Sequence, residues 1–287
     1  MKNLASVSVI KEILADSGFK FSKSLGQNFL IDDNILDKIV ESSSIGKDCG
    51  AIEIGPGFGT LTQRLCMAAG KVVAIEIDKA AIPILEDNLS DFDNLKIINE
   101  DVLRCDLGKI IADEFKGMNV RIAANLPYYI TTPIIMHVLE SGLPVDSLTV
   151  MIQKEVAMRI AAKEGTKDYG ALTVAVNFYS EPEVVVHVPP SAFIPQPKVS
   201  STVIRLKLRD KPPVDVADEK CFFKIVKAAF GQRRKTLLNA LSNSPAIPLD
   251  KEGVAAVLAE CSIDEKRRGE TLTLQDFADI SNKIFVK

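Results

Sequence analysis

A glycine-rich turn between two apolar runs constrains the fold of this chain more than any other feature. The stretch Ala51-Ile-Glu-Ile-Gly-Pro-Gly-Phe-Gly-Thr60 is followed by Val73-Ala-Ile-Glu-Ile-Asp78. Three glycines in five residues after Ile54 let the backbone leave a buried strand sharply and approach a ligand. Glu76, twenty-one residues after Gly55, ends the next predicted strand, where a carboxylate can accept hydrogen bonds from both ribose hydroxyls. This order predicts the start of a doubly wound, Rossmann-like α/β sheet.

The turn also discriminates between adenosine cofactors. A dinucleotide fingerprint has a third glycine where Thr60 stands here, and the carboxylate of Glu53 would repel a pyrophosphate. Both departures favour S-adenosylmethionine, whose amino and sulfonium groups are positively charged. We therefore predict that Gly55 and Gly57 contact this cofactor. The alternative is a tight structural turn without a ligand.

Length and composition set broader limits. A chain of 287 residues, 47% of them hydrophobic, is long enough for one large domain with its own core and a second small one. The formal net charge of -3 gives no global attraction to nucleic acid, so such a partner would need a local basic patch. No apolar run approaches the ~20 residues of a membrane span, and we expect no membrane partner.

The N-terminal residues and the cysteines indicate a cytoplasmic protein. Glu12 and Asp16 lie among the first lysines, and no arginine precedes Arg64, which argues against a secretory or mitochondrial signal. Five scattered cysteines disfavour both disulfides and zinc, and we interpret them as small buried residues. With only His137 and His187, each interpreted as structural, no metal site is predicted.

Apolar periodicity gives the order of the elements. Helices are predicted at 7–18, ending at Gly18, and at 33–42 and 61–69. Strands are predicted between helices at 50–54, 72–77, 95–98, 120–124 and 147–152. This alternation is typical of a parallel sheet. Later strands at 172–178, 183–188 and 201–208 would add an antiparallel edge.

Lys211-Pro-Pro213 marks the predicted domain boundary, because helical periodicity without strands follows it. We predict a catalytic domain over 1–211 and a small α-helical domain over 212–287. Within the first, Asp101 follows the third strand of the sheet and is predicted to accept from the exocyclic amine of the cofactor adenine. Thr132-Pro133 predicts the cap of a later helix.

A second motif, Asn125-Leu-Pro-Tyr128, follows the fourth strand. The proline fixes the backbone, so the Asn125 amide oxygen and a neighbouring carbonyl can face the two N–H groups of a planar exocyclic amine. Tyr128 offers a ring on which a base can stack, and Phe193, between two proline pairs, is the predicted second ring. Transfer of the methyl group from the sulfonium to such a neutral amine is an in-line displacement, which needs orientation rather than a strong base. The alternative for Asn125 to Tyr128 is an ordinary strand-to-helix turn, and the alternative for Phe193 is a core phenylalanine.

A basic run supplies the local patch. Residues 220–235 contain six basic and no acidic residues, with a helix face of lysines opposite a face of apolar side chains. Gly231 is predicted to interrupt this helix and present Arg233, Arg234 and Lys235 to phosphates. The plainer interpretation is a solvated surface.

Six motifs in order resemble the bacterial small-subunit ribosomal RNA adenine dimethyltransferase family over nearly the whole chain. They are Leu25-Gly-Gln-Asn-Phe-Leu30, Glu53-Ile-Gly-Pro-Gly57, Asn125-Leu-Pro-Tyr128, Gln153-Lys-Glu-Val156, Pro195-Gln-Pro-Lys-Val199 and Phe230-Gly-Gln-Arg-Arg-Lys-Thr-Leu237. The chain departs from the family pattern at Phe58, Tyr129 and Ser200, and Tyr129 leaves open which of two adjacent tyrosines faces the base.

The resemblance implies dimethylation of two adjacent adenosines in a hairpin loop near the 3′ end of small-subunit ribosomal RNA, during ribosome assembly. It implies S-adenosylmethionine binding through Asn28, Leu30, Gly55, Glu76, Asp101 and Asn125, and it places Asn28 and Leu30, which the spacing alone did not. Residues 1–211 would then be the methyltransferase catalytic domain and residues 212–287 the RNA-binding domain. Lys198 is counted with the predicted RNA-binding residues, and the immature small subunit is the expected partner of a monomer.

Three other functions are compatible with these sequence features. One is an enzyme methylating an adenosine of large-subunit RNA, which the extended segment around Arg233 disfavours. Another is an RNA-binding assembly factor without catalysis, and the most distant is a nicotinamide oxidoreductase.

Overall fold

The computed structural model describes residues 2–17 and 28–286. It contains two compact units, of which the first comprises residues 1–157 and 181–208 and the second residues 158–180 and 209–287. The predicted boundary at 211–212 lies close to Arg209, but residues 158–180, expected in the catalytic domain, cluster with the C-terminal helices. The chain thus crosses between the units three times.

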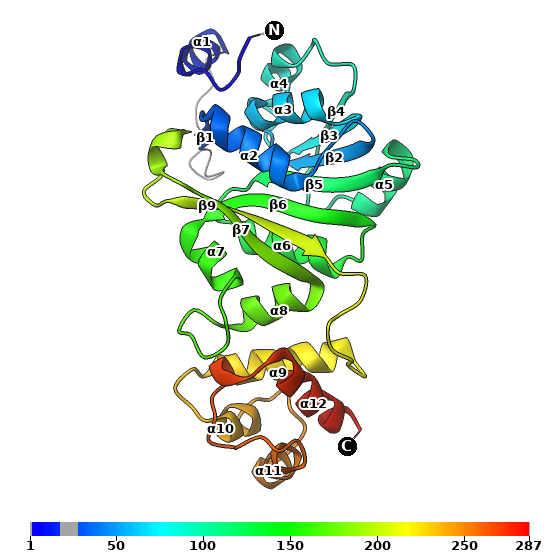
Figure 1. The fold of residues 1–287 in the computed structure, drawn as a ribbon, viewed down its shortest axis with the longest axis vertical. Coiled ribbons are helices and arrows are strands. Elements are labelled where there is room, and N and C mark those ends of the chain that lie inside the picture. Colours follow the sequence, from blue (N-terminus) through cyan, green and yellow to red (C-terminus); the bar gives the residue numbers. More distant parts are fainter. Residues whose placement is uncertain (1, 18–27, 287) are drawn as a thin grey trace. The chain divides into compact units, whose positions relative to one another are not determined.

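A seven-stranded sheet in the order β4-β3-β2-β5-β6-β9-β7 forms the centre of the first unit (Figure 1). Its strands are β2 (Cys49–Ile54), β3 (Lys71–Glu76), β4 (Leu95–Asn99), β5 (Asn119–Asn125), β6 (Val145–Gln153), β7 (Ser180–Val188) and β9 (Ser201–Leu208). Strands β2 to β6 pair in parallel, whereas β9 runs antiparallel to β6, with Val150 opposite Ile204. The predicted doubly wound sheet and its antiparallel addition are confirmed.

Helices of the first unit connect these strands. They are α1 (Val7–Ser17), α2 (Asp33–Ser43), α3 (Thr60–Ala68), α4 (Ile82–Asn88), α5 (Leu107–Glu114), α6 (Thr131–Glu140) and α7 (Lys154–Ile160), the last ending in the second unit. Helices α2 and α3 bury their apolar faces against one face of the sheet, in a core that includes Leu36, Leu65, Ala51 and Met151. The predicted end of the first helix at Gly18 lies outside the described residues.

The strand order creates a crevice where ligands bind in folds of this type. Strand β2 lies between β3 and β5, so the chain leaves β2 toward one side of the sheet and returns to its other side. At such a switch point the loops after the two central strands diverge, leaving space beyond the carboxyl ends of the strands. A short antiparallel pair, β1 (Phe29–Leu30) with β8 (Phe193–Ile194), forms a separate two-stranded sheet.

The second unit is built from helices. It contains α8 (Ala171–Tyr179), α9 (Glu219–Gly231), α10 (Leu237–Ser242), α11 (Lys251–Glu260) and α12 (Leu274–Phe285). Their core includes Phe178, Phe222, Leu241, Val257 and Phe277. The predicted interruption at Gly231 is confirmed, since α9 ends at that residue.

Two local predictions are wrong. The segment 172–178, predicted as a strand, lies in α8. Its apolar residues at every second position also place Val174 and Phe178 one helical turn apart, and both enter the core of the second unit. Helix α6 begins at Thr131, so Thr132 and Pro133 stand inside its first turn rather than at its cap.

Candidate functional site

One pocket opens at the carboxyl ends of β2, β3, β4 and β5. It is lined by every residue predicted to bind the cofactor, namely Asn28, Leu30, Gly55, Gly57, Glu76, Asp101 and Asn125. Apolar side chains, including those of Leu61, Ile75, Leu126, Ile130 and Ile134, form much of the remaining wall. The structure therefore brings residues from distant stretches of the sequence to one cavity at the switch point of the sheet.

The glycine turn forms one side of this pocket. Gly55 and Gly57 adopt positive φ angles of 70° and 58°, which residues with a Cβ rarely adopt. A Cβ at Gly57 would lie 2.7 Å from the Phe29 ring, whereas a Cβ at Gly55 would meet no described atom within 4 Å. Gly57 thus permits close packing on Phe29, and Gly55 leaves its backbone open toward the cavity.

Glu76 stands at the end of β3 with both carboxylate oxygens held in place. Its Oε2 accepts from the Gly57 backbone N–H at 3.1 Å and its Oε1 from the Asp78 N–H at 2.8 Å. Burial raises the pKa of Glu76, and these N–H groups partly oppose that effect. Because a carboxylate has about four acceptor positions, Glu76 keeps acceptor capacity for a ligand hydroxyl.

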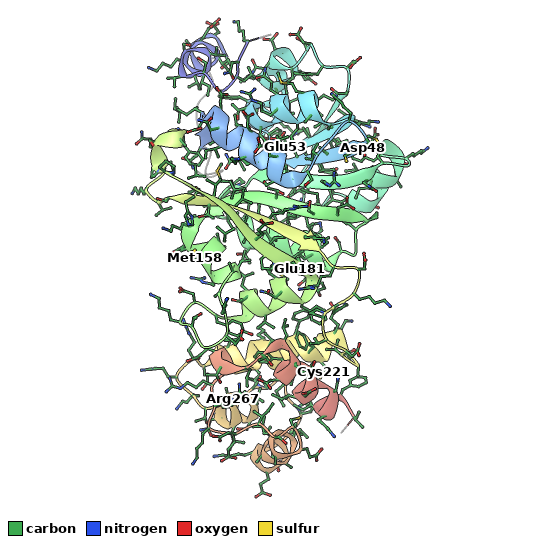
Figure 2. All side chains as sticks on the ribbon, in the orientation of Figure 1. Asp48, Glu53, Met158, Glu181, Cys221 and Arg267 are labelled. Atoms are coloured by element: carbon green, nitrogen blue, oxygen red, sulfur yellow. The ribbon has the colours of Figure 1, made fainter. Side chains whose placement is uncertain are left out.

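Glu53, labelled in Figure 2, is a buried acid on β2. It also lines the pocket. Only 1% of its surface is exposed, and its Oε2 atom has no hydrogen-bond partner within residues 2–17 and 28–286. Burial raises the pKa of Glu53 to about 8, and the neighbouring Glu76 adds to the rise, whereas Thr62 opposes it. A buried carboxyl group with one oxygen lacking a partner among the described residues suits a positively charged group in the cavity.

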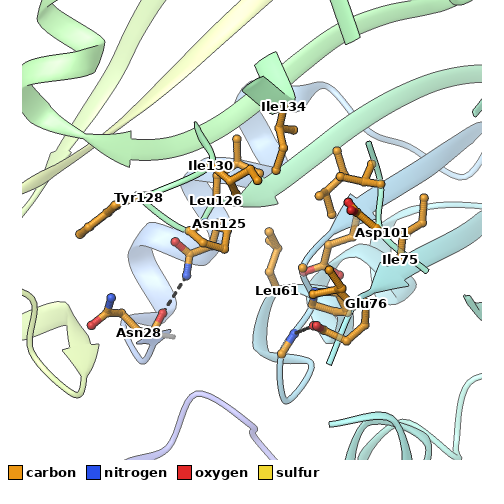
Figure 3. Close-up of a pocket in the computed structure, with 18 of the residues that line it drawn as sticks. Asn28, Leu61, Ile75, Glu76, Asp101, Asn125, Leu126, Tyr128, Ile130 and Ile134 are labelled. Carbon is orange, nitrogen blue, oxygen red and sulfur yellow. Dashed lines mark hydrogen bonds between the residues drawn. The ribbon is translucent and has the colours of Figure 1, made fainter. Parts of the chain in front are cut away.

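Asn125 ends β5 and is oriented by the segment around Asn28. Its Nδ2 donates to the Asn28 carbonyl at 3.0 Å, so its Oδ1 is the amide atom left to accept from a ligand. Figure 3 shows Asn125 and Tyr128 on one side of the pocket and Glu76 and Asp101 on the other. Asp101 is anchored by the Leu103 N–H, which donates to its Oδ1 at 3.0 Å.

Two adjacent tyrosines line the pocket in different ways. The half-buried Tyr128 has its hydroxyl 2.7 Å from the Ser201 hydroxyl on β9, which fixes the ring. Tyr129 is 54% exposed. Its pKa is raised mainly by partial burial and further by the nearby carboxylates of Asp101 and Glu76. Tyr129 is therefore the tyrosine near the acidic side of the pocket.

Phe193 occupies a position that differs from its predicted role. It pairs with Leu30 across β1 and β8, is only 1% exposed and packs in the core with α2 and α3. It is not among the pocket-lining residues, so in this structure it offers no ring face to a base. The local sequence could not reveal this, because the pairing partner lies more than 160 residues earlier.

Three loops of the second unit carry a second candidate surface. The exposed residues Arg233, Arg234 and Lys235 lie between α9 and α10. Arg233 donates to the Lys167 carbonyl, and the Leu237 N–H donates to the Arg267 carbonyl at 2.7 Å. We call the segments 163–167, 232–236 and 264–268 the basic loops, and Figure 2 labels Arg267 in the third. The predicted Lys198 is exposed in the first unit, after β8.

Some parts of the predicted site lie elsewhere or were not foreseen. Leu25, Gly26 and Gln27 of the first motif lie outside the described residues. The apolar wall from Leu61, Ile130 and Ile134 was missed, because nothing in a single apolar residue distinguishes a ligand contact from the core. No cluster of metal-binding side chains occurs within 2–17 and 28–286. In the same described ranges, no helix is long and apolar enough to cross a membrane.

The switch-point pocket, with its glycine turn and its acid at the end of β3, defines a doubly wound enzyme that takes an adenosine cofactor. The sequence matches the ribosomal RNA adenine dimethylase family over residues 18–284, and the chain belongs to that family.

Sequence relatives cover the whole chain. A ribosomal RNA small subunit methyltransferase A from Alkaliphilus oremlandii is 55% identical over 287 residues, which is all of both chains. Its counterpart from Geobacillus thermodenitrificans is 56% identical, covering 99% of this chain and 97% of the relative. The predicted family is therefore confirmed.

Solved structures share the fold. A dimethyladenosine transferase from Plasmodium falciparum has a TM-score of 0.75 and 25% identity, covering 88% of this chain and 95% of that one. The 23S rRNA methyltransferase ErmE has a TM-score of 0.67, also at 25% identity, covering 90% and 99%. The nicotinamide oxidoreductase considered above finds no support in either likeness.

Proposed function

We propose that this chain transfers two methyl groups from S-adenosylmethionine to the exocyclic N6 of each of two adjacent adenosines. The proposed target is a hairpin loop near the 3′ end of small-subunit ribosomal RNA, in immature small subunits assembled in the cytoplasm. The observation that carries the proposal is the position of Asn125, whose Nδ2 is held by the Asn28 carbonyl and which lines the same pocket as Glu76 and Asp101. A monomer is sufficient, because all these groups belong to one chain.

The side chains of the pocket fit the proposed cofactor. Glu76 keeps acceptor capacity for a ribose hydroxyl, and Asp101 for the amine of an adenine. The unpartnered Oε2 of Glu53 suits the positive charges of the amino acid and sulfonium groups. When bound, S-adenosylmethionine supplies an electrophilic methyl group on a sulfonium. Asn28, Leu30, Gly55 and Gly57 would contact the cofactor along the same wall.

The residues at the end of β5 would hold the target adenine. Asn125 Oδ1 accepts one N–H of the exocyclic amine, and its own Nδ2 is fixed by the Asn28 carbonyl. Tyr128 is our choice for the stacking ring, since its hydroxyl is anchored on Ser201. A base–aromatic contact of this kind contributes ~1 to 3 kcal/mol. Orientation of a neutral amine requires no strong general base, and no histidine is among the pocket-lining residues.

Sequence similarity favours the small subunit over the large one. The small-subunit methyltransferases are 55% and 56% identical over nearly their whole length, whereas ErmE is 25% identical. Both kinds of particle should therefore be offered to the protein with labelled S-adenosylmethionine, each isolated from cells that lack it. We expect label in small-subunit RNA alone. Label confined to large-subunit RNA would overturn the assignment.

The second unit is proposed to bind RNA through Arg233, Arg234 and Lys235, with Lys198 contributing from the first unit. Exposed cations on ordered loops suit phosphate contacts, whose contribution weakens with salt.

Removing two of these charges should weaken binding and flatten its salt dependence. For Arg234→Gln combined with Lys235→Gln we expect the slope of log affinity against log salt to fall by about two, as roughly one unit is lost for each phosphate contact. Filter binding of small-subunit RNA at several salt concentrations measures this slope. A matched control, Lys116→Gln with Lys251→Gln, removes two exposed lysines outside the basic loops. Equal slopes for the two variants would contradict the assignment.

A further inference from the structure

The N-terminal segment, residues 2–17, is bound to the helix that follows the glycine turn. Gln63 of α3 is only 1% exposed, and its side chain bonds two backbone groups of the segment. Its Oε1 accepts from the Leu4 N–H at 3.2 Å, and its Nε2 donates to the Lys2 carbonyl at 2.8 Å. A third hydrogen bond runs from Asn3 Nδ2 to Asp33 Oδ2 on α2, at 3.0 Å.

Apolar contacts extend this attachment to both sides of the glycine turn. Leu4 is 2% exposed and packs with Leu85 of α4 and with Leu89, which follows that helix. Those two leucines also lie 3.0 and 2.9 Å from where a Cβ of Gly59 would be. The segment therefore supports the leucine side chains against which the turn packs.

Helix α1 reaches the other side through Ile10. Ile10 is fully buried in a cluster with Phe29 and Phe58. The two rings stack with centroids 4.1 Å apart and planes 10° from parallel, and the Phe29 ring occupies the space beside Gly57. Phe29 lies between Asn28 and Leu30, which line the pocket, whereas no described residue of 2–17 lines it.

We propose that residues 2–17 form a clasp that holds Phe29 against the glycine turn and so shapes the cofactor pocket from outside it. Gln63 and Ile10 are then positioning residues for cofactor binding. A pocket whose walls are held before the ligand arrives binds it more tightly, because less ordering accompanies binding. This proposal rests on the proposed binding of S-adenosylmethionine in the pocket.

Linkage gives a test that requires no variant. If docking of the clasp strengthens cofactor binding, bound cofactor must strengthen docking by the same factor. Hydrogen exchange of the α1 amides in the full-length protein should therefore slow when S-adenosylmethionine is saturating. Helix α5, which lines no part of the pocket, is the internal control and should change less. Unchanged exchange in α1 alongside slower exchange at Asn28 to Leu30 would overturn the clasp.

Variants separate this proposal from a general loss of stability. For Ile10→Ala we expect the Kd for S-adenosylmethionine to rise roughly tenfold, within the usual range of coupling between sites. The kcat at saturating cofactor should stay at the wild-type value, and Ile10→Leu should restore most of the affinity. Val7→Ala, at a position 43% exposed on the same helix, is the matched control.

The outcomes distinguish the two proposals. If the wild-type protein fails to bind S-adenosylmethionine, the proposed function is wrong. If the wild type binds and Ile10→Ala binds equally well while the α1 amides exchange faster, the clasp is wrong. Gln63→Glu, which keeps the acceptor for Leu4 but loses the donor to Lys2, should weaken binding in the same sense.

Discussion

Replacing Asn125 with alanine is expected to lower kcat for methyl transfer by roughly 100-fold or more, at saturating cofactor and RNA. The Oδ1 atom of Asn125 is the acceptor proposed to orient the amine, and its Nδ2 bond to Asn28 fixes that orientation. Without the acceptor the N–H group is not held, and the nitrogen lone pair stays delocalised into the ring instead of pointing at the methyl group. Single-turnover kinetics on small-subunit particles measure the effect.

The same strand provides a matched control for this substitution. Asn119 begins β5, at the end of the strand away from the pocket, and its side chain is exposed. Asn119→Ala should leave kcat unchanged, and neither variant should alter the affinity for RNA. Wild-type kcat in Asn125→Ala would contradict the catalytic role proposed for Asn125.

The second large effect concerns pH and the buried carboxyl of Glu53. In the free protein its pKa is raised to about 8, so the folded chain holds a proton that an unfolded chain releases above about 4.5. Stability from this group is complete below about 4.5 and is lost as pH rises toward 8, by up to ~1.4 kcal/mol per pH unit. Glu53→Gln should reduce this slope, leaving the contribution of Glu76, whose pKa is raised as well.

Cofactor binding should have the opposite pH dependence. A cation beside Glu53 favours the ionised carboxylate, so affinity for S-adenosylmethionine should increase up to roughly tenfold per pH unit until about pH 8. Calorimetric titrations from pH 6 to 9, in buffers of different ionisation enthalpy, should detect proton release on binding. The Glu53→Gln variant should bind more weakly at pH 8 and with less dependence on pH. Identical pH profiles for variant and wild type would exclude Glu53 as the partner of the charged groups.

Much of the pocket followed from the sequence, because parallel strands gather polar residues from successive strand ends at one edge. Gly55, Glu76, Asp101 and Asn125 are each recognisable beside an apolar run, and all four line the cavity. Asn28 and Leu30 were predicted as cofactor-binding residues from the family resemblance alone. Their place depends on β1 pairing with β8, a contact between segments that no local pattern connects.

The failures have a common physical cause. Leu172 to Phe178 has an apolar pattern that fits a strand, yet Val174 and Phe178 pack in the core of the second unit as parts of a helix. The prolines around Phe193 predict an exposed aromatic ring in a stiff loop, but the pairing of β8 with β1 buries this ring. The orientation of Asn125 toward Asn28 and the attachment of Tyr128 to Ser201 are likewise side-chain bonds between distant segments.

The proposed reaction is tested most directly by identifying the bases it produces. Small subunits from cells lacking this protein should be incubated with it and S-adenosylmethionine, and the RNA digested and analysed by mass spectrometry. We predict N6,N6-dimethyladenosine at two adjacent positions of a hairpin loop near the 3′ end of small-subunit RNA, and none with Asn125→Ala. Methylation at a ring nitrogen or a ribose hydroxyl would contradict the proposed geometry of Asn125, and unmodified RNA would contradict the function itself.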